Sequence, residues 1–445
     1  MAPGRFSARS PGEAITRGAT SYRATSRRAA SSRPAPRGVA SPAATSTAAA
    51  PLAKRGRGGS LAARCVLLES GLELCPGELV WDATGTITAL RRPRGPIADL
   101  CVLPGLVNAH AHLQIEPVDA PRVFLPWVRA VIAARLATSP AAMDAATRTA
   151  ARQLLAEGVT AVGEIDSTGR TPRALAGTGL AGRCYQELTG FHLDASASRK
   201  LVRDRRGDAV SGLLAGLSPH APYSVSPALF QAAAKATRHL AIHCAELPEE
   251  QQFLREGTGP FADLLRNLGR LPAGFRAPRV GAVRWLERLG VLLPGTQLVH
   301  CQELERGDLA RIAASGAGIA VCPGTIVWFS RTPPPVPKWL AAGIDVALGT
   351  DSRASSDAFS LRAELRAAAR FWPELSPQQL FTMATVAGGR TLGRPRLGRL
   401  VRGGRADFLC VTARSDRALA HLEPFVHGEL AVARVFAAGH EVSRS

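Results

Sequence analysis

The fold is decided by the stretch Leu103-Pro104-Gly105-Leu106-Val107-Asn108-Ala109-His110-Ala111-His112. A Pro-Gly turn comes first, and an apolar run of strand length follows it and ends in two histidines. Downstream of this stretch, short apolar runs alternate with Ala-, Leu- and Arg-rich segments of helical period. Such a strand, loop, helix order is typical of parallel βα units and not of hairpins.

Eight apolar runs follow this order. They are residues 106–112, 159–165, 182–188, 212–218, 240–243, 297–300, 318–322 and 345–349. Helical periods lie between them at 141–157, 227–238, 308–315 and 361–369. Because an open sheet rarely reaches eight strands in so regular a repeat, the pattern favours a closed, TIM-like (β/α)₈ barrel.

Short strand-like runs flank the predicted barrel on both sides. Residues 64–68 and 85–90 precede it, and residues 400–412 and 426–442 follow it. We expect these flanks to pair into one small β-sandwich domain, built from residues 61–103 and 396–445, beside a barrel of residues 104–395. The expected fold class is therefore α/β, with the barrel as the main body.

Residues 1–60 differ from the rest of the chain in composition. They hold ten Arg and one Lys against a single acid, Glu13, which accounts for half of the formal net charge of +20. With almost no large apolar residues, the segment cannot bury enough surface to offset its ordering entropy, so we expect a disordered basic tail. An organelle transit peptide, a twin-Arg signal and a start codon placed too far upstream are open as its origin, and we favour the last.

The composition of the whole chain is that of an ordinary globular protein, with 46% hydrophobic and 20% charged residues among 445. No run of 18 apolar residues occurs, which argues against a membrane partner. Eight cysteines without a Cys-x-x-Cys pair indicate neither a disulfide framework nor a zinc ribbon, so we expect a reducing cytoplasm. Aromatic residues do not interleave with the basic ones, so nucleic-acid binding through the tail is a minor alternative.

Five of the ten histidines lie at or just beyond the carboxyl ends of predicted strands. They are His110, His112, His220, His243 and His300. Catalytic groups collect at that rim of a barrel. Because side chains alternate along a strand, His110 and His112 share the face that points into the lumen, where two neutral imidazoles can share one divalent ion.

Two carboxylates join this set. Glu246 follows His243 by three residues and is placed to take a proton from a water molecule without being a ligand. Asp351 follows the last strand and can complete the coordination, while His300 can hydrogen-bond the attacking oxygen or Asp351. A solvated glutamate at a helix start is the alternative for Glu246. Histidine and aspartate around one ion suit Zn²⁺, with Fe²⁺ or Mn²⁺ as alternatives.

Other motifs near these residues have simpler interpretations. None of the four lysines lies at a strand end, where a two-metal site would need a bridging one, so a single metal fits better. Cys244, Cys301 and Cys322 are interpreted as small buried strand residues and not as ligands or nucleophiles. The string at residues 177–182 matches the dinucleotide pattern Gly-x-Gly-x-x-Gly but leads into a strand, so we expect a turn there.

Over residues 103–404 and the flanking β segments, the chain resembles the amidohydrolase superfamily, and within it the mononuclear metal-dependent deaminases. The resemblance implies one divalent metal, most simply zinc, held by His110, His112, His243 and Asp351. It implies three catalytic residues, namely Glu246 as proton shuttle, His300 and Asp351. Substrate contacts are expected from His220, Glu246 and Arg135. Arg135 is included because Trp127-Val128-Arg129 leads to it where adenosylhomocysteine deaminases have Trp-Pro-x-Glu.

Residues 243–261 and 349–356 are most similar to the aminodeoxyfutalosine deaminases of menaquinone synthesis. We therefore expect hydrolytic deamination of a purine nucleoside, with aminodeoxyfutalosine as the predicted substrate. Deamination of S-adenosylhomocysteine, methylthioadenosine or guanine, dechlorination of a triazine, and a barrel that serves as a non-catalytic scaffold stay open. Gln114 and residues 322–326 depart from the family pattern near the substrate. The expected partner is a small molecule, and a homodimer is the assembly to test.

Overall fold

The computed structural model describes residues 58–69, 71–207, 209–210 and 212–443. The predicted basic tail of residues 1–60 lies outside the described residues except for its last three, and strand β1 already begins at Gly59. None of the described helices combines the length and the apolar character that a membrane crossing requires.

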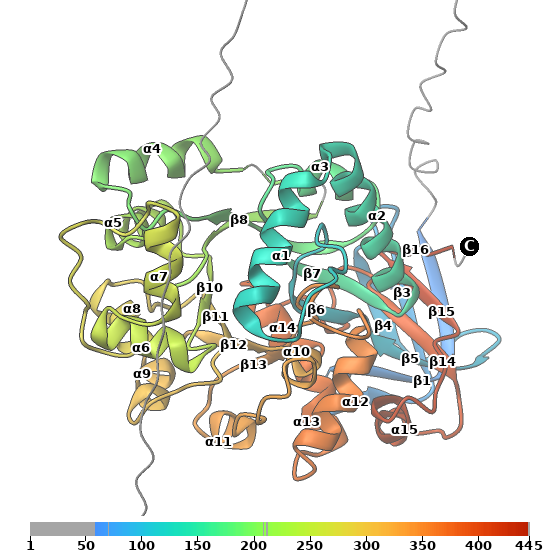
Figure 1. Cartoon of the computed structure of the whole chain (residues 1–445). Helices are drawn as coiled ribbons and strands as arrows, with labels where there is room; N and C mark the ends of the chain where they lie inside the picture. The colour runs from blue at the N-terminus through green and yellow to red at the C-terminus, as the bar shows by residue number, and fades with distance from the viewer. Residues whose placement is uncertain (1–57, 70, 208, 211, 444–445) are drawn as a thin grey trace, which may run out of the picture. The chain divides into compact units, whose positions relative to one another are not determined.

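Eight parallel strands form a nearly closed barrel, in hydrogen-bonded order from β6 to β13 (Figure 1). Their bounds are β6 Leu106–Ala111, β7 Val159–Asp166, β8 Ala181–Leu188, β9 Leu213–Pro219, β10 Leu240–Cys244, β11 Thr296–His300, β12 Gly318–Val321 and β13 Val346–Leu348. A bridge between Ala111 and Asp351 joins the first strand to the segment after the last. The predicted TIM-like barrel is confirmed.

Helices connect these strands, and the four predicted helical periods coincide with four of them. They are α1 Phe124–Ala137, α2 Pro140–Ala156, α3 Thr171–Leu175, α4 Ala195–Arg205, α5 Pro227–Ala236, α6 Pro248–Glu256, α7 Pro260–Asn267, α8 Ala282–Arg288, α9 Asp308–Ser315, α10 Pro323–Trp328, α11 Val336–Ala341, α12 Leu361–Phe371, α13 Pro377–Met383 and α14 Val386–Thr391. Several begin with a serine cap followed by proline. Ser226, for example, accepts the Leu229 N–H at 3.2 Å before Pro227 starts α5. The cap satisfies a free amide, and proline fits the first turn because it has no N–H to lose.

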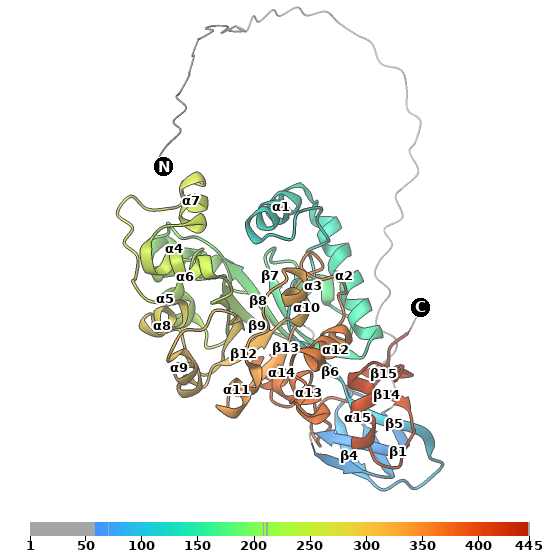
Figure 2. The same ribbon diagram turned by 60° about the horizontal axis from the view of Figure 1, so that its bottom comes forward.

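The two flanking segments form one mixed sheet, in which the N-terminal and C-terminal strands lie side by side (Figure 2). Its strands are β1 Gly59–Glu69, β2 Leu72–Leu74, β3 Gly77–Trp81, β4 Ile87–Arg91, β5 Ala98–Pro104, β14 Phe408–Thr412, β15 Arg434–Ala437 and β16 His440–Glu441. A short turn of helix, Leu419–His421, and α15, Leu422–Val426, lie between β14 and β15. Trp81, Phe408 and Phe436 pack against one another in its core, with the two phenylalanine rings stacked at 4.4 Å. The small β domain expected from the flanks is present.

Asp407 ties the mixed sheet to the start of the barrel. Its side chain accepts the Ala438 N–H at 2.7 Å and the Arg405 Nε–H at 2.8 Å, and its carbonyl accepts the Gly105 N–H at 3.0 Å. Arg405 also donates to the carbonyl of Gly179 at 2.7 Å.

The glycine-rich string at residues 177–182 is a turn that leads into β8, as the sequence predicts.

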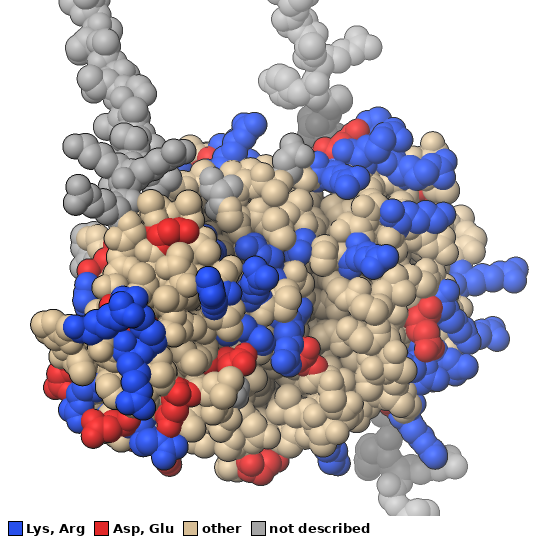
Figure 3. Space-filling view, turned by 180° about the vertical axis from the view of Figure 1, so that it is seen from behind, with Lys and Arg blue, Asp and Glu red and all other residues tan. Residues whose placement is uncertain are grey.

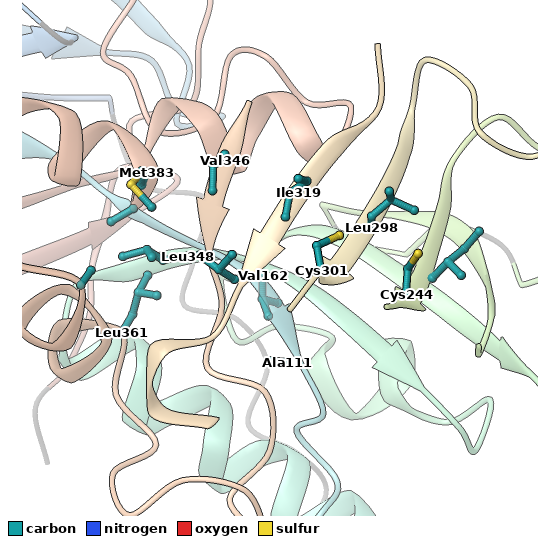
Figure 4. Packing of buried hydrophobic residues seen from close by; sticks show 14 of the residues in the cluster. Ala111, Val162, Cys244, Leu298, Cys301, Ile319, Val346, Leu348, Leu361 and Met383 are labelled. Atoms are coloured by element: carbon teal, nitrogen blue, oxygen red, sulfur yellow. The ribbon is translucent and has the colours of Figure 1, made fainter. Parts of the chain in front are cut away.

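The apolar core lies between the barrel strands and the surrounding helices. Figure 4 shows Leu298, Ile319 and Val346 on neighbouring strands, together with Cys244 and Cys301 in the same cluster. Since side chains alternate along a strand, these residues face the helices while their neighbours face the lumen. Cys322 is buried as well, so all three cysteines near the histidines are buried strand-end residues, as predicted.

Charged side chains cover the outside of the protein. On the face in Figure 3, arginine and lysine side chains are spread over the surface, and acidic side chains lie among them. On this face several basic side chains also lie together along a hollow at the centre, between areas that are mainly uncharged.

Gly349 offers a test of how tightly the barrel closes. A Cβ atom at this position would lie 2.8 Å from both the Cβ and the carbonyl oxygen of His110 on the first strand. We expect Gly349→Ala to lower the free energy of unfolding by about 1–3 kcal/mol, because overpacking forces backbone shifts. Denaturant titration measures this difference. Gly95→Ala is the control, since a Cβ there meets nothing within 4 Å; equal stability of the two variants would contradict a tight closure.

Candidate active site

The predicted strand-end residues converge in the barrel lumen. His110 lies in β6, His243 in β10 and His300 at the end of β11, whereas His112 and Asp351 follow β6 and β13. The Nε2 atoms of His112 and His243 are 3.4 Å apart. Oδ1 of Asp351 lies 3.5 Å from Nε2 of His110 and 3.6 Å from Nε2 of His112. All five side chains are buried.

Hydrogen bonds between the first and last strands set this geometry. The His110 carbonyl accepts the N–H groups of Thr350 and Asp351 at 2.9 and 3.1 Å, and the His112 N–H donates to the Asp351 carbonyl at 3.1 Å. The Asn108 side chain donates to Oγ1 of Thr350 at 2.8 Å and accepts the Thr350 N–H at 3.2 Å. Asp351 is therefore held directly against the two histidines of β6.

The cluster has the features of a divalent metal site. Both ring nitrogens of His110 are buried and have no hydrogen-bond partner among the described residues. Nδ1 of His243 lies 3.1 Å from the carbonyl of His220, which selects the tautomer that leaves Nε2 free. The ligand atoms of His110, His112 and His243 lie within 4.8 Å of one another, and so do those of His110, His300 and Asp351. Because the two groups share His110, their imidazoles and the one carboxylate can serve a single cation, and nitrogen and oxygen donors of this kind suit zinc.

The protonation states agree with this use. Burial lowers the pKa of His112 to about 3 and holds the pKa of His243 well below its ordinary value, so both rings are neutral. Burial alone would raise the pKa of Asp351, but His110 and the neighbouring imidazoles of His112 and His300 hold that pKa well below its usual range. Neutral imidazoles beside an ionised carboxylate are the forms that bind a metal.

Glu246 lies beside this cluster and is only 4% exposed. Its Oε1 is 3.9 Å from Nε2 of His300 and 3.2 Å from Nη1 of Arg331. Its N–H donates to Oε2 of Glu250 at 2.9 Å. The interpretation of Glu246 as a solvated glutamate at a helix start is wrong, because the carboxylate points into the site and not into solvent.

Several residues that hold the side chains of the site in place could not be identified from the sequence. Oδ2 of Asp351 accepts the hydroxyls of Ser355 at 2.7 Å and Thr325 at 3.1 Å. Ser355 belongs to the motif at 349–356, and Thr325 to the segment that departs from the family pattern. Glu250 is fully buried, which raises its pKa to about 8. The only sequence signal for Glu250 is its spacing of four residues from Glu246. No sequence pattern points to Arg331.

Strained backbone marks the same strand ends. Ala245, His300, Cys301 and Asp351 all have positive φ, between 49° and 72°. Non-glycine residues rarely adopt this left-handed conformation, which costs roughly 1–3 kcal/mol each and is found mainly where function requires it. The positive φ values turn the chain sharply after β10, β11 and β13, so that the side chains of His300 and Asp351 lie in the cluster.

A cavity of about 460 Å³ leads from this cluster to the surface. His220 lies at its inner end, with its Nδ1 2.7 Å from the Ser224 hydroxyl. Tyr223 and Phe261 form a stacked wall with their rings 3.9 Å apart. Arg135 lines the outer part and donates to the Ser167 carbonyl at 2.8 Å. The remaining outer lining is mostly apolar and comes from α1 and α7: Val128, Val131, Ile132, Leu136, Leu264, Leu265 and Leu268.

A second group of ligand-type side chains lies in the mixed sheet, where Cys65, Cys101 and His421 converge. Nδ1 of His421 lies 2.9 Å from the Arg417 carbonyl, and its Nε2 accepts the Arg414 N–H at 2.8 Å. Both ring nitrogens are already engaged by the backbone, so His421 has no lone pair to offer a cation. We interpret this group as packed core.

Comparison with known proteins identifies the family to which the chain is similar. Residues 101–442 match the amidohydrolase family. An aminodeoxyfutalosine deaminase of Deinococcus radiodurans is 33% identical over 327 residues, which cover 66% of this chain and 74% of that protein. A 5-methylthioadenosine/S-adenosylhomocysteine deaminase of Nitratidesulfovibrio vulgaris is 28% identical over 86% of this chain and 87% of its own length. The structure of Helicobacter pylori aminofutalosine deaminase with methylthio-coformycin shares the fold, with a TM-score of 0.71 at 22% identity over 86% of this chain and 100% of that one.

Substitution of one histidine tests the ligand set. We expect His243→Ala to lose most of its bound metal, because removal of one of four ligands opens the coordination sphere. Metal content per chain, measured by mass spectrometry of the purified protein, gives the result. His427→Ala is the control, since His427 is exposed and far from the strand ends. Full metal occupancy in His243→Ala would refute the ligand set.

Proposed function

This chain belongs to the amidohydrolase family, and from that premise we propose that it is a metal-dependent deaminase of an amino-substituted purine nucleoside, with aminodeoxyfutalosine as substrate. It is a hydrolase of carbon–nitrogen bonds, as its deaminase relatives are. The observation that carries the proposal is the buried Glu246 carboxylate beside a cluster of three imidazoles and one aspartate. We place the reaction in the cytoplasm, as a step of menaquinone synthesis.

We propose that His110, His112, His243 and Asp351 hold one divalent cation. Such an ion would supply a water molecule that is nucleophilic at neutral pH. Zinc is the proposed metal because the donors are nitrogen and oxygen in a set of four, with iron and manganese as alternatives.

Glu246 is the proposed proton shuttle. It takes a proton from the attacking water and delivers it to the ring nitrogen next to the carbon that bears the amino group, which makes that carbon electrophilic. The water oxygen bonds to this carbon, and Glu246 then takes the remaining proton of that oxygen and passes it to the amino group, so that the carbonyl forms as the carbon–nitrogen bond breaks and ammonia leaves. The products are ammonia and a ring carbonyl, so one water is consumed for each amino group lost.

His300 and Asp351 orient the attacking oxygen in this scheme. Burial lowers the pKa of His300, although Glu246 and Asp351 act in the opposite direction, so its ring is neutral and able to donate one hydrogen bond. Its Nε2 lies 3.9 Å from Glu246, so an oxygen placed between them would contact both side chains. Asp351, anionic and held by two hydroxyls, accepts a hydrogen bond from that oxygen.

The cavity supports a nucleoside in preference to a bare base. Its volume of about 460 Å³ falls within the range of roughly 300–1,000 Å³ that holds drug-sized ligands. We propose that His220 contacts the purine and that Arg135 contacts the far end of the molecule. Methylthioadenosine or S-adenosylhomocysteine is the second candidate, because a relative with that name matches nearly the whole chain. Guanine and triazines leave the outer cavity unfilled.

Glu246→Gln tests the proton shuttle. The variant keeps the size of the side chain but cannot accept and return a proton, so we expect kcat to fall by at least about 10²-fold while metal content stays the same. Steady-state kinetics and metal analysis measure the two quantities. Glu249→Gln, which changes a more exposed carboxylate three residues further along the chain, in the first turn of α6, should leave kcat unchanged. A near-normal rate in Glu246→Gln would mean that another group moves the proton.

Ammonia release from a panel of compounds tests the substrate. We expect kcat/KM for aminodeoxyfutalosine to exceed that for guanine by about 10²-fold or more, because only a long nucleoside fills the outer cavity, and to exceed that for methylthioadenosine and S-adenosylhomocysteine, because the outer lining is mostly apolar and suits an aromatic substituent better than a methylthio group or a charged amino acid. A coupled ammonia assay with the metal-loaded enzyme measures each value. The highest value for methylthioadenosine would move the enzyme to the second candidate, and no turnover of any compound would favour a scaffold.

A further inference from the structure

We propose that Arg331 is a positioning residue that fixes the carboxylate of Glu246 for proton transfer. Arg331 lies between α10 and α11, outside every motif that the sequence analysis uses. Its Nη1 atom lies 3.2 Å from Oε1 of Glu246 and 3.4 Å from the main-chain carbonyl oxygen of the same residue. The proposal rests on the deaminase function, since it assigns Arg331 a role through the shuttle.

The two contacts to one residue restrict the Glu246 side chain. One guanidinium nitrogen of Arg331 contacts both the main-chain carbonyl and the carboxylate of Glu246. Rotation about the side-chain torsions of Glu246 would move the carboxylate away from this nitrogen and break that contact. The N–H of Glu246 is held as well, by Oε2 of Glu250 at 2.9 Å. All three polar groups of Glu246 are therefore fixed, so little rotamer freedom is left to lose when the substrate binds.

Arg331 is itself held rigidly. Its guanidinium lies 4.6 Å from the ring centre of Phe329 and 5.6 Å from that of Phe124 on α1. The main-chain N–H of Arg331 donates to the Ile326 carbonyl at 2.9 Å, and the preceding residue, Ser330, has a positive φ of 52°. The side chain is only 15% exposed. A planar cation over aromatic faces keeps its orientation, whereas a lysine ammonium on a flexible stem would not.

The loop that carries Arg331 is anchored from beneath. The Gly324 N–H donates to Oε2 of the buried Glu364 at 2.5 Å. A Cβ atom at position 324 would lie 2.5 Å from Oε1 of the same carboxylate, so only glycine lets α10 start this close. This anchor sets the direction of α10 and thus brings Arg331 over Glu246. The contact between Gly324 and Glu364 is a structural reason for the glycine at position 324, within the segment 322–326 that departs from the family pattern.

Two substitutions of Arg331 distinguish positioning from simple neutralisation of a buried charge. We expect Arg331→Met to lower kcat by about 10²-fold with KM within about threefold, because misplacement of a proton-transfer group costs rate and not binding. Arg331→Lys, which restores the charge without the planar fork, should recover kcat by about tenfold. Arg434→Met is the control, since Arg434 also pairs with a glutamate and lies 4.8 Å from a phenylalanine ring, far from the site. Metal content and melting temperature are measured for all variants.

A crystal structure of Arg331→Met gives a readout that needs no activity. We expect the Glu246 carboxylate to occupy more than one rotamer in the variant and a single rotamer in the wild-type protein. If the wild-type enzyme turns over no compound of the panel, the proposed function fails, but this structural result still tests the positioning role. A wild-type kcat in Arg331→Met, a Glu246 side chain unmoved in that variant, or a full return to the wild-type kcat in Arg331→Lys, which would leave only neutralisation of charge, would overturn the proposal.

Discussion

The site depends on the contact between the first and last barrel strands. Asn108 and Thr350 are 242 positions apart, yet their side chains and backbone are joined by two hydrogen bonds. The same contact delivers two backbone amides to the carbonyl of His110. Because these bonds fix Asp351 relative to His110 and His112, the arrangement of these three side chains follows from closure of the barrel. Chemistry that needs side chains from both the first and the last strand of the barrel is available only when the hydrogen bonds between these two strands form.

Burial of charge is the second constraint, and it is met in two ways. Glu246 pairs with the guanidinium of Arg331, and Asp351 accepts hydrogen bonds from two hydroxyls, and these contacts offset the cost of desolvating each carboxylate. Glu250 and Glu364 have no such cation close by, and burial raises the pKa of each to about 8. Each accepts one backbone amide from a site loop, that of Glu246 or of Gly324. Two acids with raised pKa values thus brace the loops after β10 and β12, while Asp351 and Glu246 line the cavity.

The sequence predicts the barrel well and the site in part, for a physical reason. Strands buried on both faces, such as β10 and β12, are made mostly of apolar residues, and polar residues at the end of such a run lie at the rim of the barrel. Histidines after these runs could therefore be assigned to the site. Arg331 could not, because a polar residue on an irregular loop obeys no period. Its position depends on the Gly324 anchor and on Phe124, which is distant in sequence.

Catalysis and substrate selection rest on parts of the fold that differ in rigidity. The strand ends that carry the histidines are fully buried and pinned by short hydrogen bonds. Helix α1, in contrast, has no fully buried residue, and Leu136 is 83% exposed although it lines the cavity. Substitutions in α1 therefore cost little stability, since they leave no cavity in a packed core. They also leave the ligands in place, so a barrel of this kind can change its substrate while it keeps its chemistry. Relatives with different named substrates and the same fold are the expected consequence.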